Sequence, residues 1–125
     1  MEADKKILEY QYFNQQLRTL IEYLETLKKY YEEIINTIES LNLCKNEKEF
    51  YVDLGNNIFT RVNLQEQKFL VNIGSGIFLE KNLEEALEIL NKRKLEVEKE
   101  IQETNNNIQI LYDYLKKLEE EIKNK

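Results

Sequence analysis

The sequence lacks histidine, proline and tryptophan, and it contains only one cysteine and three glycines. Without histidine, catalytic triads, histidine general bases and zinc sites built on histidine are excluded. The carboxylates are spread along the chain instead of gathering near one motif, so nothing indicates an active site. We therefore expect that the chain is not an enzyme.

The scarcity of helix-breaking residues indicates how the chain is organised. There is no proline, and Gly55, Gly74 and Gly76 all lie in one central window, so both flanks are free of strong helix breakers. Long helices are expected on either side of a central segment of a different kind.

The single cysteine, Cys44, cannot form a disulfide within the chain, which is typical of proteins from the reducing cytosol or nucleus. The first residues, MEADKKILEY, lack the apolar core of a signal peptide, and no apolar run reaches the roughly 18 residues of a membrane span. We expect a soluble protein of the cytoplasm, with the nucleus as a second compartment. Cys44 itself is interpreted as a small apolar residue.

Acidic and basic residues are interspersed along the chain, which carries a net charge of −6 at pH 7. Counterion release from a nucleic acid requires a clustered basic surface, so neither nucleic acid nor a membrane is an expected partner. The turn Gly74-Ser75-Gly76 lacks the lysine of a phosphate-binding loop, and no cofactor or metal is expected. The runs EEE at 119–121 and KK at 28–29 are interpreted as solvated helix faces.

Apolar residues recur in the first third of the chain at alternating steps of three and four residues. This spacing is the heptad pattern of a coiled coil, and it fills every a and d position. It predicts a helix over residues 4–43, with Ile7, Ile21 and Ile35 widening the apolar stripe on one side. The residues of this first seam are Tyr10, Phe13, Leu17, Leu20, Leu24, Leu27, Tyr31, Ile34, Ile38 and Leu41.

A second heptad series predicts a helix over residues 82–124, which we expect to fold back on the first as an antiparallel coiled coil. Pairing outward from the helix ends places Tyr31 near Lys94 and Phe13 near Tyr112. Lys94 and Thr104 are the polar members of this seam, and Lys94 can fix the register because a polar seam residue penalises misaligned pairings. The second seam comprises Leu83, Leu87, Leu90, Lys94, Val97, Ile101, Thr104, Ile108, Leu111, Leu115, Leu118 and Ile122.

Residues 49–80 change from heptads to the alternation of β-strands. FYVDL at 50–54, the turn Gly55-Asn56-Asn57 and IFTRVNL at 58–64 predict a β-hairpin. FLVNI at 69–73, the turn at 74–76 and IFL at 77–79 predict a second one. The expected fold is mainly α with a small β insert, in which two β-hairpins join a long antiparallel two-helix coiled coil in one domain over residues 1–125.

Two short hairpins cannot bury their own apolar faces, and an isolated hairpin is at best marginally stable in water. Strands of other subunits are expected to complete these faces, so residues 49–80 are interpreted as an oligomerisation platform. Its contact residues are Phe50, Val52, Leu54, Ile58, Val62, Leu64, Phe69, Val71, Ile73, Ile77 and Leu79, and its turn residues are Gly55, Gly74 and Gly76.

This order of elements resembles an alpha-class subunit of prefoldin. The resemblance extends over essentially the whole chain, and its most specific parts are VDLG at 52–55, VNIGSGIFLEK at 71–81 and EEALE at 84–88. VDLGNNIF at 52–59 and KILEYQYF at 6–13 are further similar to the alpha-class member of the prefoldin-like co-chaperone complex.

The resemblance implies a hetero-hexamer of two alpha-class and four beta-class subunits, with β-barrels at its centre and coiled coils projecting from it. It also implies an ATP-independent co-chaperone that delivers unfolded client proteins to a chaperonin. In the prefoldin-like complex, the implied role is in a larger Hsp90-associated assembly.

The two chain ends are expected to meet at the end of the coiled coil farthest from the hairpins. That end holds more apolar surface than one two-helix seam can hide, so we expect it to bind apolar segments of unfolded clients. Most of these residues also fit seam packing, whereas Tyr12, Tyr112 and Tyr114 lie off the seam. A coiled-coil scaffold that binds no client is the alternative, and it predicts fully paired tips. The candidate client-binding residues are Ile7, Tyr10, Tyr12, Phe13, Leu111, Tyr112, Tyr114, Leu115 and Leu118.

Overall fold

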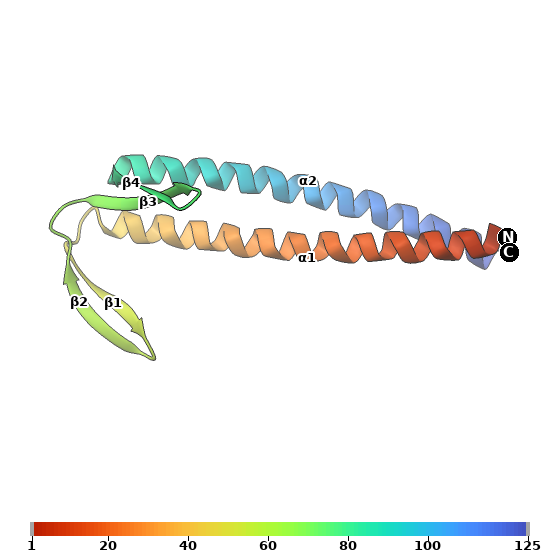
Figure 1. Cartoon of the computed structure of the whole chain (residues 1–125), viewed down its shortest axis with the longest axis horizontal. Helices are drawn as coiled ribbons and strands as arrows, with labels where there is room; N and C mark the ends of the chain where they lie inside the picture. The colour runs from red at the N-terminus through yellow and green to blue at the C-terminus, as the bar shows by residue number, and fades with distance from the viewer. Residues whose placement is uncertain (1, 125) are drawn as a thin grey trace. The chain divides into compact units, whose positions relative to one another are not determined.

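The computed structural model describes residues 2–124 and consists of two long helices with two β-hairpins between them (Figure 1). The predicted fold class is confirmed. The first helix begins two residues before its predicted start, and the last strand runs directly into the second helix. The elements are α1 (Glu2–Leu43), β1 (Glu49–Gly55), β2 (Ile58–Asn63), β3 (Lys68–Gly74), β4 (Ile77–Asn82) and α2 (Leu83–Lys123).

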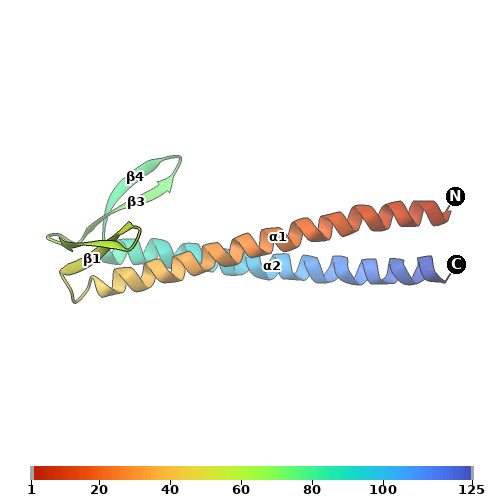
Figure 2. The same cartoon turned by 90° about the horizontal axis from the view of Figure 1, so that it is seen from below.

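The chain divides into two compact units, each of which contains part of both helices. The first unit combines residues 1–32 and 95–125, and the second is the continuous segment 33–94, with both hairpins. In the first unit the helices run antiparallel, because Lys6 near the start of α1 contacts Glu121 near the end of α2, with 3.4 Å between Nζ and Oε2. The start of α1 and the end of α2 therefore lie at the same end of this unit (Figure 2).

All but one of the buried residues between positions 2 and 124 lie at predicted seam positions, and the exception is Ala86 of α2. The seam positions that the heptads predict are either buried or half-buried, including the half-buried Lys94. Thr104 is polar and yet only 4 % exposed. The heptad pattern thus locates a core that is narrow, because a two-helix seam buries only one stripe of each helix. The buried apolar residues are Leu27, Val97, Leu115 and Leu118 in the first unit and Ile34, Leu83 and Ala86 in the second.

The first hairpin, β1–β2, closes through a tight turn with positive φ at three successive residues, Gly55 (106°), Asn56 (53°) and Asn57 (61°). Glycine and asparagine tolerate this region of backbone space, which explains why the sequence places them there. The amide of Gly55 donates to Oδ1 of Asp53 at 2.7 Å, and the strand pairing shifts between these two residues. Leu54 therefore lies in a β-bulge instead of the regular ladder.

The second hairpin, β3–β4, has the same construction. Its turn has positive φ at Gly74 (122°), Ser75 (53°) and Gly76 (73°). The amide of Gly74 donates to Oδ1 of Asn72 at 2.9 Å, and the pairing again shifts between these two residues. Each hairpin therefore ends in a bulge followed by a tight turn.

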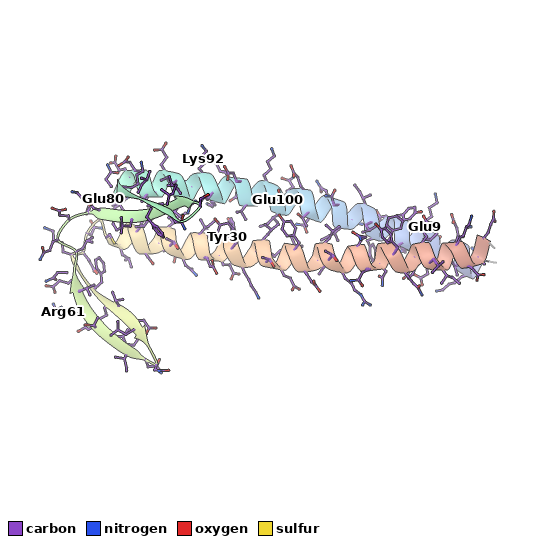
Figure 3. The ribbon with its side chains drawn as sticks, in the orientation of Figure 1. Glu9, Tyr30, Arg61, Glu80, Lys92 and Glu100 are labelled. Carbon is purple, nitrogen blue, oxygen red and sulfur yellow. The ribbon has the colours of Figure 1, made fainter. Side chains whose placement is uncertain are left out.

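Each hairpin also carries an ion pair across its two strands. Arg61 of β2, labelled in Figure 3, pairs with Glu49 of β1. Glu80 of β4, labelled in the same figure, pairs with Lys68 of β3 at 3.9 Å. All four side chains are more than half exposed or at that limit, so such pairs contribute about 0–1 kcal/mol each.

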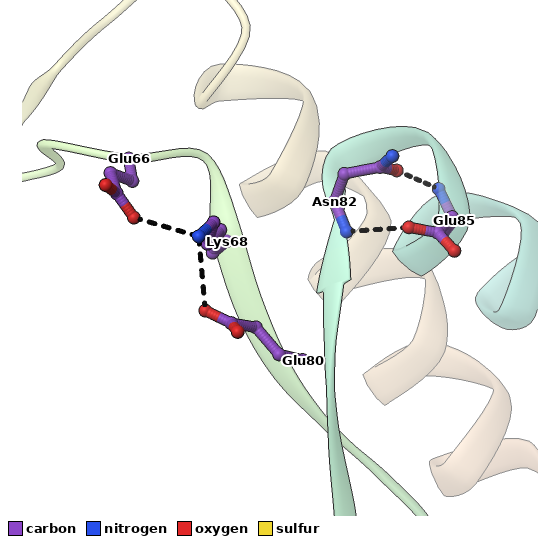
Figure 4. Close-up of polar contacts among 5 residues, drawn as sticks. All are labelled: Glu66, Lys68, Glu80, Asn82 and Glu85. Atoms are coloured by element: carbon purple, nitrogen blue, oxygen red, sulfur yellow. Dashed lines mark hydrogen bonds and ion pairs between the residues drawn. The ribbon is translucent and has the colours of Figure 1, made fainter.

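A capping box explains why α2 begins at Leu83. The Asn82 side chain accepts a hydrogen bond from the amide of Glu85 at 2.8 Å, and the Glu85 carboxylate accepts one from the amide of Asn82 at 3.1 Å (Figure 4). Two backbone amides at the helix start are thereby satisfied, so β4 passes into α2 without a loop.

Candidate functional site

The first candidate interaction surface lies on the hairpins. Most of the predicted oligomerisation residues are exposed there, from 39 % for Val62 to 65 % for Leu54. Their apolar side chains are available for a partner, and their role in assembly stays a prediction. The exposed members are Val52, Leu54, Ile58, Val62, Ile73, Ile77 and Leu79, and the half-buried members are Phe50, Leu64, Phe69 and Val71.

The opposite face of each hairpin also exposes apolar side chains, next to the charged residues of its ion pair, which the sequence reasoning missed. Tyr51 and Leu70 are 72 % and 73 % exposed, and Phe59 and Phe78 are each 56 % exposed. The signal was present in the alternation, since these residues occupy the positions between the predicted platform residues. Each hairpin therefore exposes apolar side chains on both of its faces.

The second hairpin rests one face on the helices of its own unit. Phe69 lines a groove of about 260 Å³ together with Leu41 of α1 and Leu90 of α2. The guanidinium of Arg93 on α2 donates a hydrogen bond to the backbone carbonyl of Asn72. The first hairpin differs, because every residue of its strand β2 is exposed.

The second candidate surface is the terminal helix pair, which we define as residues 2–17 of α1 and 108–123 of α2. Ile7 and Tyr10 of α1 line a groove of about 360 Å³ together with Ile122 of α2. Tyr10 also lines an adjoining groove of about 180 Å³, to which Tyr112 of α2 contributes. One side of the terminal helix pair thus presents apolar side chains from both helices to solvent.

Aromatic rings form a cluster on the terminal helix pair. Phe13 contacts Tyr12 and Tyr114 edge to face, with ring centroids 5.1 and 5.3 Å apart. The hydroxyl of Tyr114 also donates to the Glu9 carboxylate. The register estimated from the sequence placed Phe13 near Tyr112, and the observed ring contact lies two residues further along α2.

The predicted client-binding residues differ in how accessible they are. Leu115 and Leu118 are 5 % and 4 % exposed, because they fill the seam. They can reach a client only if the helices separate, and their role stays a prediction. Tyr10, Phe13 and Leu111 are half-buried, whereas Ile7, Tyr12, Tyr112 and Tyr114 are exposed.

Tyrosine–glutamate hydrogen bonds link the helices of the first unit. Tyr23 and Tyr31 of α1 donate to Glu100 and Glu98 of α2, each at 3.0 Å, and Glu100 is labelled in Figure 3. The hydrogen bond to the carboxylate raises the pKa of each of these tyrosines, and desolvation is a smaller cause. The bond to Glu9 likewise raises the pKa of Tyr114. Each phenol must stay protonated to donate.

The described residues give little support for a reactive thiol, a metal site or a membrane-spanning helix. Burial raises the pKa of the Cys44 thiol, which disfavours the reactive thiolate. Between residues 2 and 124, no cluster of three or more cysteine, aspartate or glutamate side chains is arranged to hold a metal ion. Over the same residues, neither helix combines the length and the apolar character needed to cross a membrane.

These features define a class of protein in which two antiparallel helices are joined by exposed β-hairpins. The model of the prefoldin subunit family matches residues 13–125, and the chain belongs to this family. Prefoldins are non-enzymatic chaperones and scaffolds, and their fold implies assembly with other prefoldin subunits.

A solved structure shows the same fold. The chain is similar to filamentous PFD from Methanocaldococcus jannaschii, determined by cryo-electron microscopy, with a TM-score of 0.75 and 19 % sequence identity. The similarity covers 94 % of this chain and 98 % of that chain. The comparison with curated proteins finds no match.

Proposed function

We propose that the chain is an alpha-class subunit of prefoldin or of a prefoldin-like complex, with its closest resemblance to the branch of the ubiquitously expressed transcript protein. In this proposal it assembles through its hairpins, holds unfolded client proteins at the terminal helix pair without ATP, and passes them to a chaperonin or to Hsp90-linked machinery. The presence of two hairpins supports the alpha class, which has this order of elements. The proposed location is the cytoplasm, with the nucleus as a second compartment.

The proposed partners are a second alpha-class subunit and four beta-class subunits. Support comes from the hairpins, whose apolar residues are exposed on both faces and whose outer strand edges are unpaired within the described chain. Free strand edges bind other strands through their backbone amides and carbonyls, and apolar faces bind through burial. Hairpins from neighbouring subunits supply both kinds of contact.

The observation that carries client binding is the apolar surface of the terminal helix pair. Tyr12 and Tyr112 are 60 % and 52 % exposed, and the groove beside Ile7 and Tyr10 lies open between the helices. Tyrosine binds apolar segments through its ring while its hydroxyl stays hydrated, which suits repeated binding and release. The last turns of each helix also lack backbone partners and fray, so the grooves can widen.

The test is suppression of client aggregation by the complex reconstituted with beta-class subunits. Replacing both Tyr12 and Tyr112 with serine should lower this suppression severalfold while the native mass of the complex stays unchanged. The matched control replaces Tyr30 and Leu95 with serine, because these residues are 42 % and 65 % exposed on the same helices outside the terminal helix pair. Equal suppression by both double variants would show that the terminal helix pair does not bind clients.

A scaffold without client binding is the second candidate function. It is favoured by the closed state of the terminal helix pair, where Leu115 and Leu118 are buried and Tyr114 bonds to Glu9. Deleting residues 1–13 and 112–125 separates the two candidates. A scaffold keeps its assembly and its activity after this deletion, whereas a chaperone loses aggregation suppression and the binding of an apolar dye.

A further inference from the structure

The two sides of the terminal helix pair differ in how they join the helices. On one side, the Tyr114 hydroxyl donates to the carboxylate of Glu9, which is labelled in Figure 3, and the Tyr114 ring packs against Phe13. Glu121 follows Tyr114 by about two helical turns on the same face of α2, and its carboxylate pairs with Lys6. We call this the clasped side, because these contacts connect α1 with α2 along it.

The other side of the terminal helix pair holds two adjoining grooves along the seam. The larger groove, of about 360 Å³, lies between Ile7 and Tyr10 of α1 and Ile122 of α2. The smaller groove, of about 180 Å³, is lined again by Tyr10 and by Tyr112 and Leu115 of α2. No residue of the clasped side lines either groove. We call this second side the grooved side.

The heptad positions explain why the two sides differ. Glu9 and Tyr114 both occupy position g of their heptads, and the bond between them shows that g faces g across this antiparallel pair. Ile7 and Tyr112 occupy position e, which lies on the opposite flank of the seam. The g positions therefore close one side with polar bonds, whereas the e positions leave apolar side chains around an opening on the other.

We infer that the grooved side binds an amphipathic helical segment of a client, which lies along the seam while the clasped side stays closed. The inference rests on the proposed function, and it specifies which side of the terminal helix pair a client contacts and in which conformation.

The backbone of the bound segment determines this conformation. The amides and carbonyls in the interiors of α1 and α2 are bonded within their own helices, so the walls of the grooves offer a partner side chains only. An extended segment in such a groove loses water from its amides and carbonyls without gaining partners for them, whereas a helix satisfies these groups internally. A helix also presents one apolar stripe, which matches two grooves that follow one seam.

The charges around the grooves indicate the polar flank of the bound helix. On α2, Lys123 pairs with Glu119 at 3.1 Å, so Lys116 provides the excess positive charge of this rim. On α1, the rim residues Gln11 and Asn14 are uncharged. A helix with acidic residues beside its apolar stripe, on the flank next to α2, therefore complements the grooves better than a basic helix.

Fluorescence anisotropy with labelled peptides and the whole chain tests the inference. The first peptide is an amphipathic helix of about 18 residues, with leucines at i, i+3, i+4 and i+7 and glutamates along one flank of the stripe. The second has the same composition but alternating leucines, so that its apolar face forms only in an extended strand. The third has lysines in place of the glutamates. The first peptide should bind severalfold more tightly than either of the others.

Two matched tyrosine variants locate the binding side. Tyr112 lines the smaller groove and is 52 % exposed, whereas Tyr12 is 60 % exposed, contacts the ring of Phe13 and lines neither groove. Tyr112→Ser should weaken binding of the first peptide severalfold, because it removes an apolar wall of the groove. Tyr12→Ser should leave the dissociation constant unchanged, although it removes a ring of the same kind from the same helix pair.

Lys116→Glu tests the charge preference at an exposed position where the substitution leaves the seam intact. It should weaken binding of the acidic peptide and strengthen binding of the basic one. Unchanged affinity for both peptides would contradict the inferred orientation of the acidic flank.

Four further results would overturn the inference. Wild-type chain that binds none of the peptides would exclude the site, and equal losses in Tyr12→Ser and Tyr112→Ser would show that neither side is preferred. Tighter binding of the alternating peptide would show that the bound segment is extended. Loss of peptide binding on assembly with beta-class subunits would show that another subunit, and not a client, covers the grooves.

The double variant of the proposed function separates the two proposals. If the inference fails while the complex with both Tyr12 and Tyr112 replaced by serine still loses aggregation suppression, the proposed function remains and only the choice of side and conformation is wrong. Full suppression by that complex would overturn the proposed function itself.

Discussion

Replacing Leu118 with alanine tests whether the terminal helix pair is closed in solution. The Leu118 side chain is 4 % exposed at a seam position of α2. A large-to-small substitution at such a site loses the burial of the removed carbons and leaves a cavity, which costs about 2–5 kcal/mol in protein cores. A two-helix seam can relax toward the cavity more easily than a core enclosed on all sides. We therefore expect the lower part of that range, about 2–3 kcal/mol.

The measurement is urea unfolding of the assembled protein, followed by circular dichroism, with the midpoint and the slope both determined. Leu8→Ala is the matched control, because Leu8 lies on the same terminal helix pair and is 66 % exposed. The gain in helix propensity from leucine to alanine is the same for both variants. We expect Leu8→Ala to change the free energy of unfolding by less than about 0.5 kcal/mol. Equal effects would refute the closed arrangement, since Leu118 would then be as exposed in solution as Leu8.

Three further predictions concern the helix contacts and the second hairpin. The tyrosines that bond to glutamates have a pKa above their ordinary value of 10.0, so the stabilisation that they provide is present below pH 10 and is lost as the pH rises through the raised pKa. Helix content should fall in that range, and Tyr23→Phe should make the fall smaller. Gly74→Ala places a side chain at a φ of 122° and should cost about 1–3 kcal/mol in hairpin stability, whereas Ser75→Gly should cost none. The native mass of the complex should therefore fall for Gly74→Ala and stay unchanged for Ser75→Gly. Arg93→Ala removes the donor to the second hairpin and should speed amide exchange in β3–β4 but not in β1–β2, whereas Lys92→Ala should leave both unchanged.

The helices could be predicted from sequence because the heptad spacing reports directly on burial. Leu27 and Ile34 fall at predicted seam positions and are buried, and even the polar Thr104 is buried where the pattern places it. A seam residue faces the other helix whatever the details of packing, so the period alone decides its environment. The period does not determine the register between the helices, which is why the Phe13 ring contact lies two residues from its estimated place.

The candidate surface on the hairpins was harder to predict, because both faces of each strand carry exposed apolar side chains. Sequence reasoning assigned one apolar face to the platform and made no assignment for the other face. Tyr51 and Leu70 lie on that other face and are among the most exposed apolar residues of the hairpins. The bonds from Tyr114 to Glu9 and from Tyr23 to Glu100 could not be foreseen either, since they join residues 105 and 77 positions apart whose meeting depends on the register.

The backbone explains why permanent and transient partners suit different parts of this chain. In a helix interior, each amide and carbonyl is bonded within the helix, so the terminal helix pair can offer a partner little beyond side chains such as Tyr12 and Tyr112. Contacts of this kind impose no backbone register, which suits clients of varied sequence. A hairpin edge offers a row of amides and carbonyls at fixed spacing, and it accepts only a strand in a compatible register. Under the proposed function, stable subunit contacts therefore belong to the hairpins, and we expect that removing the hydroxyls or rings of the terminal helix pair alters client binding while leaving assembly intact.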